Sequence, residues 1–397
     1  MTFDAMWAEL AGIGRASSGG YRRYAWTRED FELREWFASS AAARGMSVVV
    51  DRAGNQWAWW GNPDEAIGVV TGSHLDSVPD GGAFDGPLGV VSAFAACDAL
   101  RAKGVELTRP LGVVNFTDEE GARFGLACVG SRLLTGALAP DRAMALRDED
   151  GTTLAEALRA GGRDAVAADP EALLRVGTFV ELHVEQGRGL VELNAPVAVA
   201  GAIWPHGRFR IDLPGEANHA GTTALADRRD PMLDYAQVVL GARASAKRHG
   251  ALATCGKVQV EPNGVNAIAS RVTAWLDARG ARADDVRAVA ADVAELARSS
   301  GGALVEESWT DRTPFDAILS DDIAHDVLGG APRLDTGAGH DAGVLAQAGV
   351  SAAMLFVRNP TGVSHSPAEF AERDDCLAGV AALTRVLGDL LAGGAQA

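Results

Sequence analysis

Four short runs of apolar, largely β-branched residues constrain the fold of this chain more than any other feature. They lie at 67–73, 111–117, 178–184 and 352–357, each bounded by Gly, Pro or charged residues. Runs of this length and composition are typical of strands buried on both faces of a parallel sheet. Helical patterns separate them, as at 88–103, and this alternation of strand and helix predicts an α/β fold.

The middle of the chain shows a different order of expected strands and helices. Between about Pro205 and Phe315, the expected elements follow the order strand, helix, strand, strand, helix, strand, which is that of a ferredoxin-like α+β domain. A chain of 397 residues is long enough for two or three domains. We therefore expect residues 1–204 and 316–397 to form a three-layer α/β/α domain, and residues 205–315 to be inserted into it.

Charge and composition exclude several classes of protein. The 36 Lys and Arg residues face 53 Asp and Glu residues, and the net charge of −17 would repel both nucleic acid and anionic membrane. Four scattered cysteines form no C-x-x-C pair, which favours reduced thiols over disulfides or a thiolate metal site. The N-terminal residues do not resemble a signal peptide, and no apolar run approaches a membrane span. These features predict a cytoplasmic protein that binds neither nucleic acid nor membrane.

Histidine and acidic residues follow all four apolar runs. In chain order they are His74, Asp76, Asp85, Asp118, Glu119, Glu120, His183, Glu185 and His365. Any one of these groups alone would indicate a surface turn or a solvated loop. Together, at the carboxyl ends of strands where α/β sheets place their sites, they form a nitrogen and oxygen ligand set suited to divalent metal.

Seven motifs, in this order along nearly the whole chain, carry a family resemblance. They are GSHLDSVPDGGAFDGPLGV, FTDEEGARFG, ELHVEQG, NHAGTT, NAIAS, GAGHDA and SHSPAE. With them the chain resembles the hydantoinase/carbamoylase amidase family, which includes N-carbamoyl-L-amino-acid hydrolases, allantoate amidohydrolases and β-ureidopropionases. The resemblance implies a metallopeptidase-like catalytic domain, an inserted lid and dimerisation domain, a homodimer, and two divalent metal ions per subunit. Zn²⁺ is the first expectation, and Mn²⁺, Co²⁺ and Ni²⁺ also accept such ligands.

The same resemblance implies a role for each metal-site residue. Asp85 would bridge the two metals, with His74 and His183 completing one site and Glu120 and His365 the other. Two further carboxylates would act beside them: Glu119 as the general base, and Asp76 as the group that orients a ligand imidazole.

Other positions match the residues with which the family binds its substrate. His219 would stabilise the negative charge of the tetrahedral intermediate, reaching the active site of the partner subunit. Gln186, Asn266 and Arg279 match positions that hold the substrate carboxylate, for which the planar fork of arginine is well suited. His340 would either contact substrate or stabilise its own loop.

The segment FVRNPTGVSH departs from the commoner family pattern. Its Arg358 and Asn359 would either reshape the substrate pocket or act only as loop residues. The sequence leaves both readings open.

The expected reaction is hydrolysis of a ureido or amide C–N bond. Two metals can hold a shared water, lower its pKa and polarise a carbonyl, while Glu119 passes the water's proton to the departing nitrogen. A small carboxylate-bearing N-carbamoyl-L-amino acid or allantoate would release ammonia and CO₂, and an N-formyl amino acid such as N-formylglutamate is a third candidate.

Two other classes of protein use this scaffold. An aminopeptidase or dipeptidase should have a carboxylate in place of His183, and a non-catalytic binding protein should have lost ligands or the base. The sequence shows neither change, and it identifies neither the substrate nor the physiological metal.

Overall fold

The computed structural model describes residues 2–393, and the chain divides into two compact units. Unit 1 consists of residues 1–201, 314–334 and 339–397, and unit 2 of residues 202–313 and 335–338. Two hydrogen bonds join the short segment 335–338 to the rest of unit 2. Trp204 N donates to Thr336 O at 2.8 Å, and Arg279 Nη1 donates to Gly337 O at 2.8 Å.

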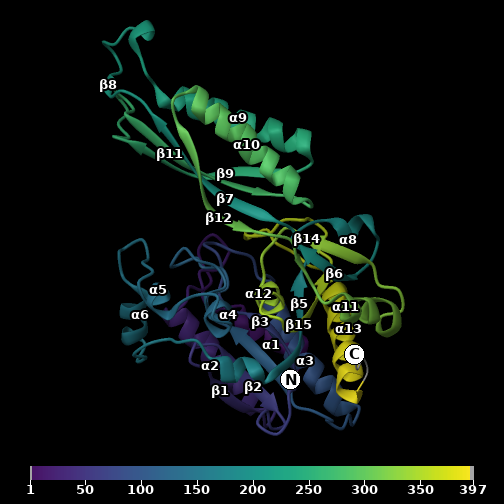
Figure 1. Ribbon diagram of the computed structural model, residues 1–397. Coiled ribbons are helices and arrows are strands. Elements are labelled where there is room, and N and C mark those ends of the chain that lie inside the picture. The colour runs from purple at the N-terminus through teal and green to yellow at the C-terminus, as the bar shows by residue number, and fades with distance from the viewer. Residues whose placement is uncertain (1, 394–397) are drawn as a thin grey trace. The chain divides into compact units, whose positions relative to one another are not determined.

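Unit 1 is built on a mixed sheet in which the four predicted strands are central neighbours (Figure 1). In sheet order the strands are β1 Ser47–Val50, β2 Gln56–Trp60, β4 Leu111–Phe116, β3 Gly68–His74, β5 Val176–Val184, β15 Ser351–Val357, β6 Val197–Ile203 and β13 Thr313–Pro314, and β14 Arg333–Thr336 pairs with β6. The run β4-β3-β5-β15 is parallel, while β2 and β6 flank it as antiparallel strands. The carboxyl ends of the four parallel strands therefore meet at one edge.

Helices cover both faces of this sheet. They are α1 Phe3–Leu10, α2 Arg28–Ala42, α3 Pro87–Ala102, α4 Val129–Leu134, α5 Pro140–Met144, α6 Leu154–Ala160, α7 Pro170–Leu174, α8 Gly189–Glu192, α11 Ala317–Asp322, η2 Ile323–Val327, α12 Asp341–Gln347 and α13 Arg373–Ala392. Alternate residues of a strand point to opposite faces, so Leu182 and Glu181 of β5 face different layers. Leu182 packs into the core below α3 and α13, whereas Glu181 accepts a hydrogen bond from Ala342 N in α12. The expected α/β class is confirmed.

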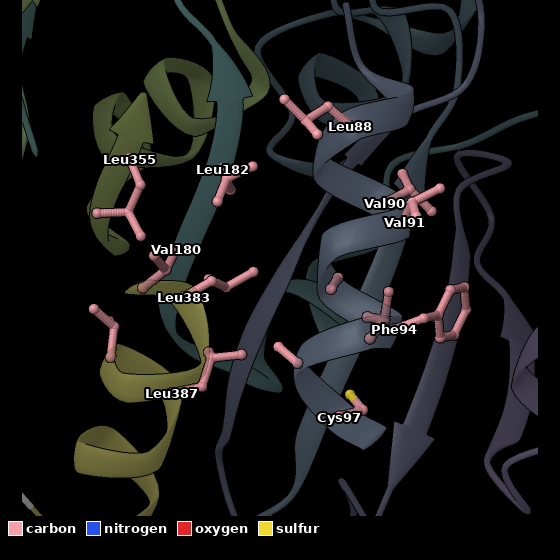
Figure 2. Close-up of a cluster of buried hydrophobic side chains, with 14 of the residues drawn as sticks. Leu88, Val90, Val91, Phe94, Cys97, Val180, Leu182, Leu355, Leu383 and Leu387 are labelled. Carbon is pink, nitrogen blue, oxygen red and sulfur yellow. The ribbon is translucent and has the colours of Figure 1, made fainter. Parts of the chain in front are cut away.

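The main core lies between the sheet and the helices α3 and α13. Figure 2 shows Leu383 and Leu387 of α13 on the side of Leu182 of β5, and Leu88 and Phe94 on helix α3; all five side chains are buried. Burying a leucine or phenylalanine side chain contributes about 1.5–3 kcal/mol relative to leaving it exposed. This packing fixes the central strands, and with them the edge at which they end.

Unit 2 is a four-stranded antiparallel sheet with two helices on one face (Figure 1). Its elements are β7 His206–Pro214, β8 Asn218–His219, η1 Leu225–Asp227, α9 Pro231–His249, β9 Leu252–Glu261, β10 Ala267–Ile268, β11 Arg271–Arg279, α10 Ala283–Ser299 and β12 Ala303–Thr310. The sheet order is β12-β7-β11-β9, and β8 pairs with β10 in a separate two-stranded sheet. Buried residues of β7 alternate with polar ones: Phe209 and Ile211 pack against α9 and α10, and Arg210 lies on the other face.

Two features concern the chain as a whole. Within residues 2–393, no helix combines the length and the apolar character needed to cross a membrane. The four cysteines are free thiols, of which Cys97, Cys128 and Cys376 are buried and Cys255 is partly buried.

Candidate metal centre

The carboxyl edge of the four parallel strands gathers the metal-ligand residues predicted from the sequence. His74 is the last residue of β3, His183 is the last but one of β5, and Glu120 lies in the segment that follows β4. Asp85 comes from the loop between β3 and α3, and His365 from the loop after β15. Chain segments far apart in sequence thus deliver their side chains to one place, because neighbouring parallel strands end there.

Asp85 stands at the centre of this cluster, with each carboxylate oxygen facing a different pair of side chains. Its Oδ1 lies 3.1 Å from His183 Nε2 and 3.4 Å from His74 Nε2. Its Oδ2 lies 3.4 Å from His365 Nε2, which is itself 3.5 Å from Glu120 Oε2. The cluster therefore contains two ligand triads that share one carboxylate.

The hydrogen bonds of the two buried histidines leave the ligating nitrogen of each ring available. His74 Nδ1 lies 3.1 Å from the carbonyl oxygen of Asp76, and His183 Nδ1 lies 2.9 Å from that of Val184. A backbone carbonyl only accepts, so Nδ1 of each ring carries a proton, and Nε2 is the nitrogen that the neutral ring would present to a metal. Both Nε2 atoms are buried and have no hydrogen-bond partner within the described chain.

Two backbone features adapt the loops to this geometry. Gly86 has a φ of +83°, and a Cβ atom there would lie 2.5 Å from two ring atoms of His74. His365 itself has a φ of +54°, a left-handed conformation that is uncommon for a non-glycine residue and recurs at functional sites. The His365 side chain is 50% exposed, so solvent reaches the cluster from its side.

Glu119 and Asp76 lie beside the cluster. Glu119 is buried, with Oε2 3.9 Å from His74 Nε2 and Oε1 3.5 Å from the thiol of Cys128. The Asp76 carboxylate accepts hydrogen bonds from the amides of Glu119 at 3.2 Å and Glu120 at 3.0 Å, and it lies 3.6 Å from His74 Nδ1. It is thus the carbonyl of Asp76 that meets the imidazole at hydrogen-bond distance, while its carboxylate holds the backbone of the two glutamates.

The charges of this cluster perturb one another. Burial raises the pKa of Glu119 well above its usual value, and burial with the nearby Asp85 raises the pKa of Glu120 to about 7. Hydrogen bonding to Asp85 raises the pKa of His365 to about 9 against the opposing effect of burial. Burial disfavours the charged form of His74, but Glu119, Asp76 and Asp85 outweigh it and lift its pKa well above the ordinary range. So many buried carboxylates in contact require positive charge nearby.

A second layer of polar groups lies beneath His183. Glu181 is fully buried and accepts hydrogen bonds from Ser73 Oγ at 2.7 Å and Ala342 N at 3.1 Å. The ring of His340 lies 4.5 Å from that of His183, centroid to centroid, and its burial beside His183 lowers its pKa well below the usual value. The sequence allowed His340 to contact substrate or to stabilise its loop, and the structure places it as a buried neighbour of His183.

Gln186 reaches the cluster directly. Its Nε2 donates a hydrogen bond to Asp85 Oδ2 at 2.8 Å and lies 3.4 Å from His365 Nε2. Ser364 Oγ lies 3.2 Å from the same Asp85 oxygen and 3.0 Å from Glu369 Oε1. Ser364 and Glu369 both lie in the SHSPAE motif around His365, but the sequence alone did not indicate either as a site residue.

Arg358 and Asn359 both make local structural contacts. Arg358 forms a two-pronged ion pair with Asp375 of α13, at 2.8 and 2.9 Å. Asn359 is fully buried, and its side chain bonds to Thr361, Gly362 and Val363 in the following turn. Of the two interpretations left open by the sequence, these contacts favour the loop role.

The remaining predicted substrate residues lie in unit 2. His219 and Asn266 are exposed neighbours at the β8–β10 pairing, where Ala220 N donates to Asn266 O at 3.0 Å. His219 Nδ1 accepts from Gly221 N at 3.1 Å, so the ring proton lies on Nε2 as a free donor. Arg279 ends β11, and Asp277 binds its guanidinium at 2.6 and 2.9 Å.

The residues of the cluster fit divalent cations. Three ligand atoms in it, His74 Nε2, His183 Nε2 and Glu120 Oε1, are buried and lack a hydrogen-bond partner among residues 2–393. Leaving such atoms unpaired is costly, and imidazole with carboxylate is a ligand set that zinc and other late first-row metals accept. The chemistry of the donors thus agrees with a resident metal.

Comparisons with known proteins place this arrangement in a family. The family model described as Peptidase family M20/M25/M40 matches residues 70–389. An N-carbamoyl-L-amino acid amidohydrolase of Geobacillus stearothermophilus is 38% identical over 97% of both chains, and an allantoate amidohydrolase of Escherichia coli is 31% identical over 95% of both. The crystal structure of a hydantoinase/carbamoylase family amidase from Burkholderia vietnamiensis, 32% identical, superimposes with a TM-score of 0.88 over 98% of this chain and 96% of that one. The chain therefore belongs to peptidase family M20/M25/M40 and, within it, to the hydantoinase/carbamoylase amidases.

Proposed function

We propose that the cluster holds two divalent cations and that the protein is a metal-dependent amidohydrolase of N-carbamoyl-L-amino acids. His74, His183 and Asp85 Oδ1 would hold one cation. Glu120, His365 and Asp85 Oδ2 would hold the other. The single observation that carries this proposal is the division of Asp85, whose two oxygens face two separate ligand sets.

Two such cations, when bound, polarise a substrate carbonyl and lower the pKa of water. The residues around them supply the rest. Glu119 Oε2, 3.9 Å from His74 Nε2, would take the proton of the attacking water and carry it to the leaving nitrogen. Two hydrogen bonds would orient Glu119 for that transfer. The thiol of Cys128 donates to its carboxylate, and its backbone amide donates to the carboxylate of Asp76.

The reaction adds water across a C–N bond. The oxygen of water joins the carbamoyl carbon, the bond from that carbon to the amino nitrogen breaks, and the nitrogen receives the proton held by Glu119. The products are a free amino acid and a carbamate, which decomposes to CO₂ and ammonia. His219 Nε2 would donate a hydrogen bond to the negative charge that develops on the carbonyl oxygen.

Allantoate is the second candidate substrate. The relative named for N-carbamoyl-L-amino acids is 38% identical and the Escherichia coli relative named for allantoate is 31% identical, each along nearly the whole chain. Both substrates combine a ureido group with a carboxylate, and the carboxylate would be bound by Gln186, Asn266 and Arg279. The higher identity favours the N-carbamoyl amino acid.

The test is ammonia release by the metal-reconstituted protein. N-carbamoyl-L-amino acids and allantoate are assayed in parallel, N-formylglutamate is assayed by formate release, and a chelator-treated sample is the control. We expect chelator-sensitive turnover, fastest with an N-carbamoyl-L-amino acid. A protein that carries two metals per subunit and turns over none of these compounds would refute the proposal.

We further propose that the enzyme acts as a homodimer joined through unit 2. The ten-residue strand β9 is an edge strand of its sheet, and such an edge offers unpaired backbone groups to another chain. Leu240 and Leu233 of the neighbouring α9 are 69% and 66% exposed, and Leu252 of β9 is 59% exposed. A second copy, related by a twofold axis, would cover both the edge and this apolar surface.

The positions of the substrate residues in unit 2 support a shared active site. His219 and Asn266 adjoin the Arg271 end of β11, whereas Arg279 is at its other end. Nine extended residues span about 25 Å, which is far longer than a small substrate. If His219 and Arg279 contact the same molecule, they belong to different subunits.

Mixed dimers test this arrangement. His219→Ala and Arg279→Ala homodimers should each be nearly inactive, because every site lacks one residue. Subunit exchange between them creates heterodimers in which one site has both wild-type residues, and a statistical mixture should recover up to about a quarter of wild-type activity. A mixture that stays inactive after proven exchange would refute the sharing of the site.

A further inference from the structure

Glu369 is a buried carboxylate that the proposed chemistry does not use. Only 5% of its surface is exposed. Its Oε2 accepts two backbone hydrogen bonds, from Phe84 N at 2.8 Å and from Asp85 N at 3.0 Å. Both amides belong to the loop that presents the shared carboxylate. Glu369 therefore holds the backbone of the residue on which the two ligand triads converge.

The other oxygen of Glu369 contacts a second loop. Its Oε1 accepts from Ser364 Oγ at 3.0 Å, and Ser364 directly precedes His365. The same hydroxyl lies 3.2 Å from Asp85 Oδ2, the oxygen that faces His365. One side chain thus spans the loop of Asp85 and the loop of His365, which are about 280 residues apart in the chain.

The Asp85 loop packs closely against the side chain of Glu369. A Cβ atom at Gly82 would lie 2.2 Å from Glu369 Oε2 and 2.4 Å from its Cβ, so the Asp85 loop approaches this side chain as closely as glycine permits. Glu369 therefore ties the Asp85 loop to the loop of His365, beside the direct contact between Ser364 and Asp85.

We propose that Glu369 is a positioning residue that sets the metal affinity of the triad formed by Asp85, Glu120 and His365. This inference rests on the proposed dinuclear site and deepens it. Glu369 touches no ligand atom itself; it acts through the amide of Asp85 and the hydroxyl of Ser364. Residues that orient metal ligands in this way typically contribute 10–100-fold to metal affinity.

Asp169 provides a matched control. It too is a buried carboxylate that joins two backbone segments, accepting from Arg52 N at 3.0 Å and Ala172 N at 3.3 Å. It hydrogen-bonds to no residue of the metal cluster among those described. Asp169→Ala therefore reports what the loss of such a bridge does to the fold alone.

The experiment titrates zinc into chelator-stripped full-length protein against a chromophoric competitor, and reads stoichiometry and affinity for each ion. We expect wild type and Asp169→Ala to bind two ions tightly. Glu369→Ala should keep one tight ion and bind the second about 10–100-fold more weakly. Glu369→Gln should recover most of the lost affinity, because its amide oxygen still accepts the two backbone hydrogen bonds.

Each outcome decides between the readings. Equal affinity of Glu369→Ala and wild type for both ions would overturn the inference, as would equal weakening in Glu369→Ala and Asp169→Ala. A wild-type protein that binds fewer than two ions would instead contradict the proposed function. If Glu369→Ala does not fold, Ser364→Ala removes one arm of the same bridge with little loss of volume, and unchanged affinity in that variant would equally overturn the inference.

Discussion

Removing metal should lower the free energy of unfolding of this protein by an amount that depends on how many ions it binds. Ligands that bind only the native state stabilise it, and above the dissociation constant each tenfold rise in free ion adds about 1.4 kcal/mol per bound ion to the free energy of unfolding. The structure contains two triads that share Asp85. If both bind, the increment becomes about 2.8 kcal/mol per tenfold rise.

This free energy converts into a shift of the unfolding temperature. The unfolding entropy of globular proteins is about 2.1 cal/mol/K per residue, which for the roughly 280 residues of unit 1 gives about 0.6 kcal/mol/K. One bound ion should therefore raise the unfolding temperature by about 2 °C per tenfold rise in free zinc, and two ions by about 5 °C.

The assay is calorimetry at a series of buffered free zinc concentrations. His365→Ala is the matched variant, since it removes a ligand from one triad and leaves His74, His183 and Asp85 for the other. We expect its slope to be half that of wild type. The assignment of two sites to this cluster would be refuted if the wild-type unfolding temperature did not change with free zinc. It would also be refuted if that temperature rose only by the amount expected for one bound ion.

Three further predictions follow from other contacts. Glu119→Gln should keep both metals and the fold but lower kcat about 10²–10⁴-fold, as measured in steady-state kinetics; near-normal turnover would remove Glu119 as the base. Gly86→Ala should lose metal affinity, because its Cβ would meet the His74 ring at 2.5 Å, and unchanged zinc stoichiometry and affinity would contradict this. Burial opposes ionisation of Asp277, but the hydrogen bonds from Arg279 outweigh it and lower its pKa, so its stabilising effect should be present above about pH 4 and disappear as the pH falls below it. Denaturant unfolding of wild type and Asp277→Asn from pH 7 to pH 3 should show a difference that shrinks on acidification, and a constant difference would argue against this pairing.

The central strands were predictable because their pattern is local and strong. The runs at 111–117 and 352–357 became β4 Leu111–Phe116 and β15 Ser351–Val357, each within a residue of the expected bounds. A strand buried on both faces has to be apolar along its length, so it can be recognised from the sequence as a continuous apolar run. The residues just beyond such strands then converge by topology, and this is how the ligand cluster could be anticipated.

Contacts between distant segments were not predictable in the same way. Nothing in the sequence indicates that Glu369 bonds to the amide of Asp85, because the partner is a backbone group that every residue carries. Asp76 illustrates the same limit: the sequence suggested that its carboxylate orients the imidazole, but its own carbonyl lies closer to His74 Nδ1. The sequence names the residue near His74, but only the structure shows whether its carboxylate or its backbone carbonyl contacts the imidazole.

The order of the strands has a consequence for synthesis of the chain on the ribosome. β15, which is hydrogen-bonded between β5 and β6, is made only after the whole of residues 202–313. At about 5–20 residues per second, the nascent β5 must wait several seconds or more for β15, with one apolar edge uncovered. Unit 2, almost continuous in the chain, can fold during this interval. His365 is translated last of the ligands, so an ion that arrives early finds the triad of His74, Asp85 and His183 complete, while the other triad has only Asp85 and Glu120.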